Sequence, residues 1–197
     1  LHLSLRRQRQ MCIRDRVCAW LETQALEFPV AVLSAFRIMA TEQPQKTALT
    51  AAMIAHLVLK PGAHSTESGK ASLGMRVMEH LIHMFGQDVD AHYWRNARLV
   101  LHVFVALAPL GVVSSASLRR TIKAFVDVLS SDGVSRDVAD PAADCVIEAM
   151  CRGGTDLIQP EPGALEALPS AREEMDAIVD GISLYGSQRN NAAIQLI

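Results

Sequence analysis

The sequence predicts an all-α fold, a superhelix of antiparallel helical hairpins in a single domain. Half of the 197 residues are hydrophobic but only 5% are aromatic, and Ala, Leu and Val are abundant, which suits helix packing better than a β-sandwich. The segment 96–129 contains two helical patterns, of which the first, around Ala97–Ala108, is apolar on nearly every side. The second pattern, Ser115–Ser130, has a one-sided apolar stripe formed by Leu118, Ile122, Phe125, Val126 and Leu129. Because a helix that is apolar all round must be covered by other helices, this hairpin is the expected centre of the core.

The first sixteen residues differ from the rest of the chain in charge. They contain five arginines and one acid, whereas the remainder is net acidic. A basic segment of this kind is typical of a nuclear-import or RNA-binding arm. However, Ser4–Arg16 resembles the translation of sequencing-adapter sequence. We therefore expect residues 1–16 to be non-native and disordered or frayed, and we exclude them from functional reasoning as one would exclude an expression tag.

Two helices are expected next. A short helix covers Val17–Ala25, and a longer one opens at Phe28-Pro29, because proline fits the first turn of a helix. This helix ends at Gln43-Pro44, since the residue before a proline is disfavoured in the α conformation. The residues expected to face inward are Val30, Leu33, Phe36 and Ala40.

Two further helices are expected before the central hairpin. The helix 46–59 ends at Lys60-Pro61-Gly62, and the stretch Pro61–Gly69 has the composition of a loop. A helix over 70–85 follows, and Gly86 is a natural end for it. The residues expected to face inward are Leu49, Met53, Ile54, Leu57, Leu73, Val77, Met78, Leu81 and Phe85.

After the hairpin break, Ser114 or Ser115 can cap the next helix. Asp140-Pro141 predicts the start of a helix over Ala142–Arg152, with Asp as the cap and Pro in the first turn. Its inward residues are Val146, Ile147, Met150 and Cys151. Gly153-Gly154 should break this helix. The last helix is expected over 165–185, with Leu168, Met175, Ile178, Val179 and Ile182 inward.

The predicted hairpins recur along the chain. Consecutive pairs begin near Pro29, Lys70, Ser115 and Gly163. This spacing of about 41 to 48 residues is close to that of HEAT-like, armadillo-type helical repeats. Each hairpin alone would leave an apolar face in water, and stacking buries it. We therefore expect one repeat domain over 17–189, a fragment of a longer protein with a truncated tail over 190–197; the alternative is an irregular helical bundle.

Histidines on the helix 70–85 are the candidates for a metal site. Glu79, His80 and His83 form the order EHxxH, which matches neither HExxH nor HxxEH. A catalytic zinc would need two imidazoles on one face, a third ligand and a base. Further ligands would have to come from Asp88, Asp90 and His92. We expect surface or partly buried helix histidines, and a zinc-dependent hydrolase remains an alternative.

The cysteines predict no disulfide framework. Cys145 and Cys151 are six residues apart on a helix and point in different directions, so they cannot bridge. Together with Cys12 and Cys18 they fit a reducing compartment, as small hydrophobic residues. The longest apolar run, Leu99–Val113, is too short for a membrane span of about 20 residues.

Other motifs of catalysis or phosphate binding do not match. Gly153-Gly154 lacks the Lys-Ser/Thr that follows a phosphate-binding loop. No GxSxG elbow is present, so the serines after the central apolar helix are expected to be cap and turn residues: Ser114, Ser115 and Ser117. The acidic residues of the last helix are expected on the solvated surface: Glu173, Glu174 and Asp176.

Basic and aromatic side chains concentrate around the central hairpin. The basic residues are Arg95, Arg98, Arg119, Arg120 and Lys123. Strong nucleic-acid binding takes about 6–10 phosphate contacts, so a solvated face is the expectation. Tyr93 and Trp94 are adjacent and point about 100° apart on a helix, so they cannot hold a cationic base between them. Trp94 is expected to pack within the hairpin.

Several of these segments together resemble a known family. The turn 112–117 follows one helix and precedes another with Phe125-Val126 at its centre. Upstream lie AVLSAFRIMATEQPQKTALTAAMIAHLVL and GMRVMEHLIHMF, and downstream lie CVIEAMCRGGTDL and EEMDAI. In order and spacing, the chain resembles the first MIF4G-type helical domain of the large subunit of the nuclear cap-binding complex. The resemblance covers roughly 17–189 and departs at Pro61–Gly69 and after Gly186.

The resemblance implies a non-catalytic scaffold that has no cofactor and is not an enzyme. In that family the large subunit has three such domains and supports a small RNP-type subunit, which grips the methylated guanosine cap. It implies a nuclear location, with cytoplasmic shuttling, and roles in mRNA processing, splicing and nonsense-mediated decay. Capped RNA would be contacted indirectly, alongside RNA-processing and export factors. Much of the interface lies in the second and third domains, so no binding residues are carried over; the alternative is a generic MIF4G scaffold in translation initiation or mRNA decay.

Overall fold

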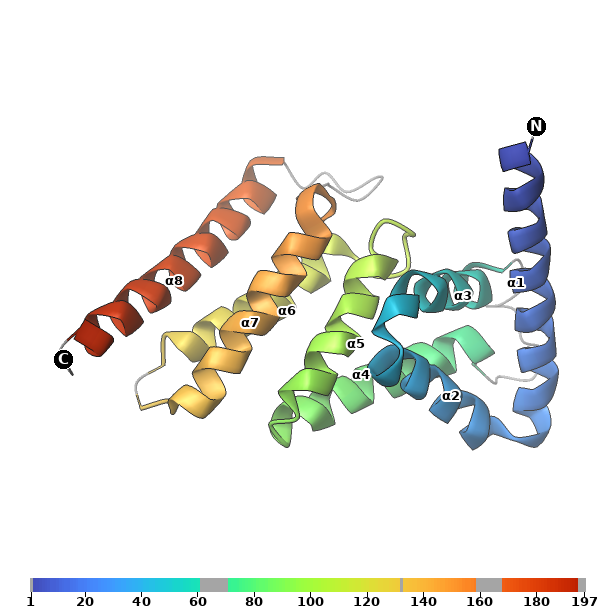
Figure 1. Cartoon of the computed structure of the whole chain (residues 1–197), viewed down its shortest axis with the longest axis horizontal. Coiled ribbons are helices and arrows are strands. Elements are labelled where there is room, and N and C mark those ends of the chain that lie inside the picture. Colours follow the sequence, from blue (N-terminus) through green and yellow to red (C-terminus); the bar gives the residue numbers. More distant parts are fainter. Residues whose placement is uncertain (1, 61–70, 132, 159–167, 195–197) are drawn as a thin grey trace. The chain divides into compact units, whose positions relative to one another are not determined.

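The computed structural model describes residues 2–60, 71–131, 133–158 and 168–194 (Figure 1). Within these ranges it has eight α-helices, two short 3₁₀ helices and no strand, so the predicted all-α class is confirmed. The chain divides into two compact units, a first unit over 1–87 and a second unit over 88–197.

The first unit is built from four helices and a 3₁₀ turn. They are α1 (His2–Glu27), α2 (Pro29–Glu42), η1 (Pro44–Lys46), α3 (Thr47–Leu59) and most of α4 (Leu73–Asp90). α1 packs against α2 and α3, and α2 also packs against α3 (Figure 1). Its fully buried side chains are Cys18, Phe36, Ala40, Ala51, Ile54, Val77 and Leu81. The predicted start at Pro29 and end before Pro44 are confirmed.

Several predictions for the first unit are corrected. Instead of a short helix over Val17–Ala25 after a disordered or frayed segment, α1 is continuous from His2. Gly86 does not end α4, which continues to Asp90; Met84 and Asp88 are buried, and their packing offsets the roughly 1 kcal/mol by which glycine disfavours a helix.

Two apolar residues expected in the core of the first unit are exposed. Val30 is 75% exposed and Leu49 is 48% exposed. Val32 and Thr50 are buried in addition to the predicted Phe36, Ala40, Met53, Ile54 and Leu57. The predicted loop Pro61–Gly69 lies outside the described residues.

The second unit stacks its helices in an alternating pattern. It consists of α5 (Trp94–Leu107), α6 (Ser115–Leu129), α7 (Arg136–Gly153), η2 (Gly154–Leu157) and α8 (Leu168–Ile194). α5 packs against α7, whereas α6 packs against both α7 and α8 (Figure 1). Each helix therefore contacts the next but one along the chain, which is how stacked helical hairpins bury a continuous core.

The central hairpin is the core of the second unit, as predicted. α5 is buried at Ala97, Leu107 and every residue from Leu99 to Val105. All five residues of the predicted stripe on α6 are buried. Ser114 is the N-cap of α6, and its Oγ accepts a hydrogen bond from the backbone N–H of Ser117 at 3.0 Å. The apolar pattern and the cap together therefore located this element correctly.

Other bounds in the second unit differ from the prediction. α7 begins at Arg136, so Asp140-Pro141 lies inside the helix, where the buried Ala139 and Ala142 continue its packed face. The carboxylate of Asp140 does not cap α7 but bonds with α8, as described below. The break at Gly153-Gly154 is confirmed: α7 ends there, and Gly154 has a φ of 46°.

The last predicted helix and some inward residues also need correction. α8 begins at Leu168 and continues to Ile194, beyond the expected end at 185 and into the predicted tail; residues 195–197 lie outside the described part. Met175 and Ile178 are buried as expected, whereas Val179 and, on α7, Ile147 are each 44% exposed. Cys151 is also exposed rather than inward.

Candidate functional site

The histidines considered as zinc ligands lie mainly on α4. His83 and Glu79 are exposed, whereas His80 is half-buried. The Nε2 atom of His80 has no hydrogen-bond partner among the described residues. Burial lowers the pKa of His80, and the positive charges of Arg37 on α2 and of His83 lower it further.

The remaining candidate ligands do not complete a metal site. Asp88 is buried, and Asp90 and His92 are exposed. Among the described residues, no group of three or more His, Cys, Asp or Glu side chains is placed to hold a metal ion.

The basic residues of the central hairpin are split between two roles. Arg95, Arg120 and Lys123 are exposed. Arg98 and Arg119 instead turn towards neighbouring helices and pair with acidic side chains there. The five residues therefore do not form one basic face.

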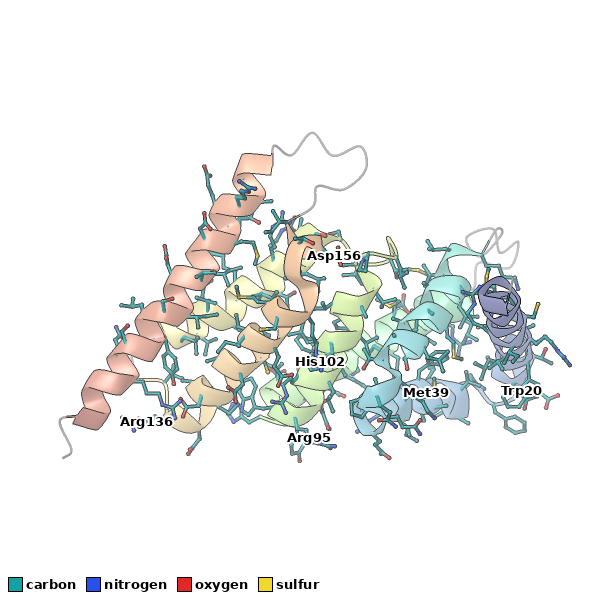
Figure 2. The ribbon with its side chains drawn as sticks, turned by 45° about the horizontal axis from the view of Figure 1, so that its top comes forward. Trp20, Met39, Arg95, His102, Arg136 and Asp156 are labelled. Atoms are coloured by element: carbon teal, nitrogen blue, oxygen red, sulfur yellow. The ribbon has the colours of Figure 1, made fainter. Side chains whose placement is uncertain are left out.

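Arg119 connects three elements of the second unit. It lies on α6 and is only 4% exposed. Its Nε donates to Glu174 Oε2 on α8 at 2.6 Å, and its Nη1 donates to the carbonyl oxygen of Leu157 in η2 at 2.8 Å. Ser115 adds a second bond to η2, because its Oγ donates to the carbonyl oxygen of Asp156 at 2.8 Å; Figure 2 labels Asp156. Glu174 lies at the surface as expected, with 43% of its side chain exposed, and it also pairs with Arg119; Glu173 and Asp176 are exposed.

A second polar cluster joins α5 to α7. Glu148 on α7 accepts a hydrogen bond from Arg98 Nη1 at 3.0 Å, and its other oxygen lies 2.9 Å from His102 Nε2 without the alignment of a hydrogen bond. Arg98 and His102 are one turn apart on α5, so one carboxylate contacts both. Figure 2 labels His102 on α5. Its side chain is 2% exposed, and its Nδ1 has no hydrogen-bond partner among the described residues.

Burial is the main influence on the pKa of His102. It lowers the pKa of His102, the charges of Arg152 and Arg98 add to the effect, and Glu148 opposes it. On the same helix as Glu148, burial raises the pKa of the Cys145 thiol to about 11. Both side chains are enclosed by packed helices, and their burial disfavours the imidazolium of His102 and the thiolate of Cys145.

The sequence did not predict His102 as part of any site. A signal was present, because Arg98 and His102 lie at i, i+4 within Ala97–Ala108, where the other residues are apolar. Their partner Glu148 is some 50 positions away on another helix, and no local pattern identifies it.

The cysteines fall into two classes. Cys18 and Cys145 are buried, as expected of small hydrophobic residues, whereas Cys12 and Cys151 are exposed; all four are free thiols. Burial also raises the pKa of Cys18, whose Sγ lies 4.0 Å from the carbonyl oxygen of Met53.

The aromatic residues before α5 do not form a sandwich. Tyr93 is 64% exposed. Trp94 stacks on His92, with ring centroids 5.8 Å apart and planes inclined by 7°, and meets Phe125 of α6 edge-on at 6.3 Å. The prediction that Trp94 packs within the hairpin is confirmed.

The fold and these contacts define an all-α protein in which polar side chains from different helices hold the helices together. No model of a known protein family matches the chain, and no curated protein matches its sequence. None of the helices in the described ranges is long and apolar enough to cross a membrane.

Proposed function

We propose that the chain is a non-catalytic scaffold that binds other macromolecules through the outer surfaces of its stacked helices. The observation that carries this proposal is the engagement of Arg119. A buried guanidinium is a strong candidate for binding an anionic substrate, yet here it pairs with Glu174 and a backbone carbonyl. Arg98 on α5 likewise pairs with Glu148 on α7, whose other oxygen lies 2.9 Å from His102 Nε2.

Within this class, we propose the large subunit of the nuclear cap-binding complex as the specific function. Its support is the resemblance of segments spread over 17–189, in the same order and spacing, together with the all-α fold that the resemblance implies. The partner would be a small RNP-type subunit in the nucleus, and capped RNA would be bound indirectly.

The mechanism we propose is a population shift in the small subunit. If the scaffold binds only the ordered form of its partner, it raises the fraction of partner that is competent to bind the cap. Rigid stacked helices suit this role, because a surface that is itself ordered can select one conformation of a partner.

Complex formation tests the proposal. The full-length scaffold that contains this chain is mixed with the small RNP-type cap-binding subunit, and the molar mass of the mixture is measured by size-exclusion chromatography with light scattering. We expect a heterodimer, and no complex with a control RNP-type domain that does not bind caps. If neither mixture gives a complex, the cap-binding assignment fails; if the protein instead binds translation-initiation or decay factors, the generic MIF4G scaffold is favoured.

A further inference from the structure

A cavity of about 230 Å³ lies in the second unit where the C-terminal end of α6 meets α8. Two leucines form apolar walls: Leu129 is 8% exposed, and Leu184 is 58% exposed. Gly133 and Gly181 contribute no side chain to the lining. The space is therefore of the size of one large side chain, with an apolar wall that is accessible to solvent.

The hydroxyl groups that line this cavity all donate hydrogen bonds within the protein. Ser130 Oγ donates to the carbonyl oxygen of Val126 at 3.3 Å, and Ser131 Oγ donates to that of Asp127 at 2.9 Å. Tyr185 donates its hydroxyl proton to Asp140. Burial and this bond to Asp140 raise the pKa of Tyr185, so its hydroxyl keeps the proton. These three oxygens can therefore only accept hydrogen bonds from a ligand.

The C-terminal end of α6 also favours a hydrogen-bond donor that carries positive charge. The last carbonyl groups of a helix carry partial negative charge and favour a cation. No Lys or Arg is among the described residues that line the cavity, and the side-chain amide of Gln188 is its one remaining side-chain donor. Beside Tyr185, Asp140 forms an ion pair with Arg189 at 2.5 Å, and Arg136 is a further charged neighbour.

We propose that this cavity receives the side chain of an arginine or lysine from a partner polypeptide. Guanidinium and ammonium groups only donate hydrogen bonds, and they complement a lining that mainly accepts them. Their aliphatic stems bury against apolar walls, here Leu129 and Leu184, while the ring of Tyr185 favours a cation near its face. The inference rests on the proposed scaffold function, to which it adds the chemistry of the partner: a basic segment.

The test is a titration of ¹⁵N-labelled protein with N-acetyl-arginine amide, followed by NMR. The backbone amides of Gly133 and Gly181 line the cavity and report on its occupancy. We expect saturable shifts of both signals, and none with N-acetyl-glutamate amide or N-acetyl-norleucine amide. Absence of shifts at these glycines, or equal shifts with the acidic or neutral probe, would overturn the proposal.

A matched pair of variants makes the test site-specific. Leu184→Lys places an ammonium group at the cavity, whereas Val179→Lys adds the same charge at an exposed position of α8 outside it. We expect Leu184→Lys to weaken arginine binding by about tenfold or more, and Val179→Lys to change it by less than about twofold. Equal binding by the two variants, with unchanged circular dichroism, would show that the probe binds elsewhere. Because the probe is a single amino acid, its binding is independent of whether the small RNP-type subunit is the partner.

Discussion

The packing of α6 against α8 depends on the absence of a side chain at Gly181. A Cβ at this position would lie 2.3 Å from Val126 Cγ1, closer than any real contact. Val126 is 5% exposed, and a β-branched side chain has little rotamer freedom with which to move away. Overpacking of this kind costs about 1–3 kcal/mol. Since alanine is favoured over glycine in a helix by about 1 kcal/mol, Gly181→Ala should lower the free energy of unfolding by about 0–2 kcal/mol.

Gly186 provides the matched control in the same helix. A Cβ at Gly186 meets no atom within 4 Å, so Gly186→Ala should gain the helix preference of about 1 kcal/mol without a packing cost. The two variants should therefore differ in stability by about 1–3 kcal/mol. For a chain of this length, each kcal/mol corresponds to about 2–4 °C in Tm.

Urea unfolding monitored by circular dichroism, together with calorimetric Tm values, measures this difference. Combining Gly181→Ala with Val126→Ala removes the opposing methyl group, so the double variant should show a coupling that offsets part of the overpacking. If Gly181→Ala stabilises the protein as much as Gly186→Ala does, α8 does not pack against α6 as described.

Three further predictions concern other parts of the fold. Phe125→Ala should lower the free energy of unfolding by about 3–5 kcal/mol, because the ring is 6% exposed and contacts Trp94. Phe28→Ala, at a ring that is 57% exposed, should change it by no more than about 0.5 kcal/mol. Thermal melts compare the two variants, and equal losses of stability would show that Phe125 is not in the core. Burial lowers the pKa of His102 in the folded protein. As the pH falls through the usual histidine pKa, the imidazole is therefore protonated in the unfolded chain before it is protonated in the folded one. The stability that the neutral His102 provides at higher pH is lost as the pH falls. In His102→Gln, the fall in unfolding free energy between about pH 7.5 and about pH 5.5 should be smaller; an unchanged fall would contradict the buried neutral state. Iodoacetamide should add two groups to the native protein, at Cys12 and Cys151, and four in denaturant; four rapid additions to the native protein would contradict the burial of the other two thiols.

The sequence predicted those helices whose signals are local. The stripe on α6 and its cap at Ser114 depend on spacings within one helix, and both were correct. Asp140-Pro141 is a local start signal that failed, because proline is tolerated inside α7 where its neighbours Ala139 and Ala142 are buried. Gly86 failed as a stop for a similar reason. In both cases the packing of a helix outweighed the preference of one or two residues.

The polar contacts between helices were beyond sequence reasoning. The sequence predicted Arg119 on a solvated face. Its partners Leu157 and Glu174 lie 38 and 55 positions further along the chain. The cavity beside α6 was equally hidden, since it depends on Gly133 and Gly181 meeting at one place. Pairings of this kind become visible only once the helices are placed in three dimensions.

The most direct test of the proposed function is the affinity of the small RNP-type subunit for a methylated cap analogue, measured by fluorescence titration with and without the scaffold. A scaffold that selects the competent form of its partner should tighten cap binding in inverse proportion to the fraction competent when free, about tenfold for a fraction of about one tenth. The protein alone should leave the fluorescence of the cap analogue unchanged. A stable complex whose cap affinity equals that of the free small subunit would contradict the proposed mechanism.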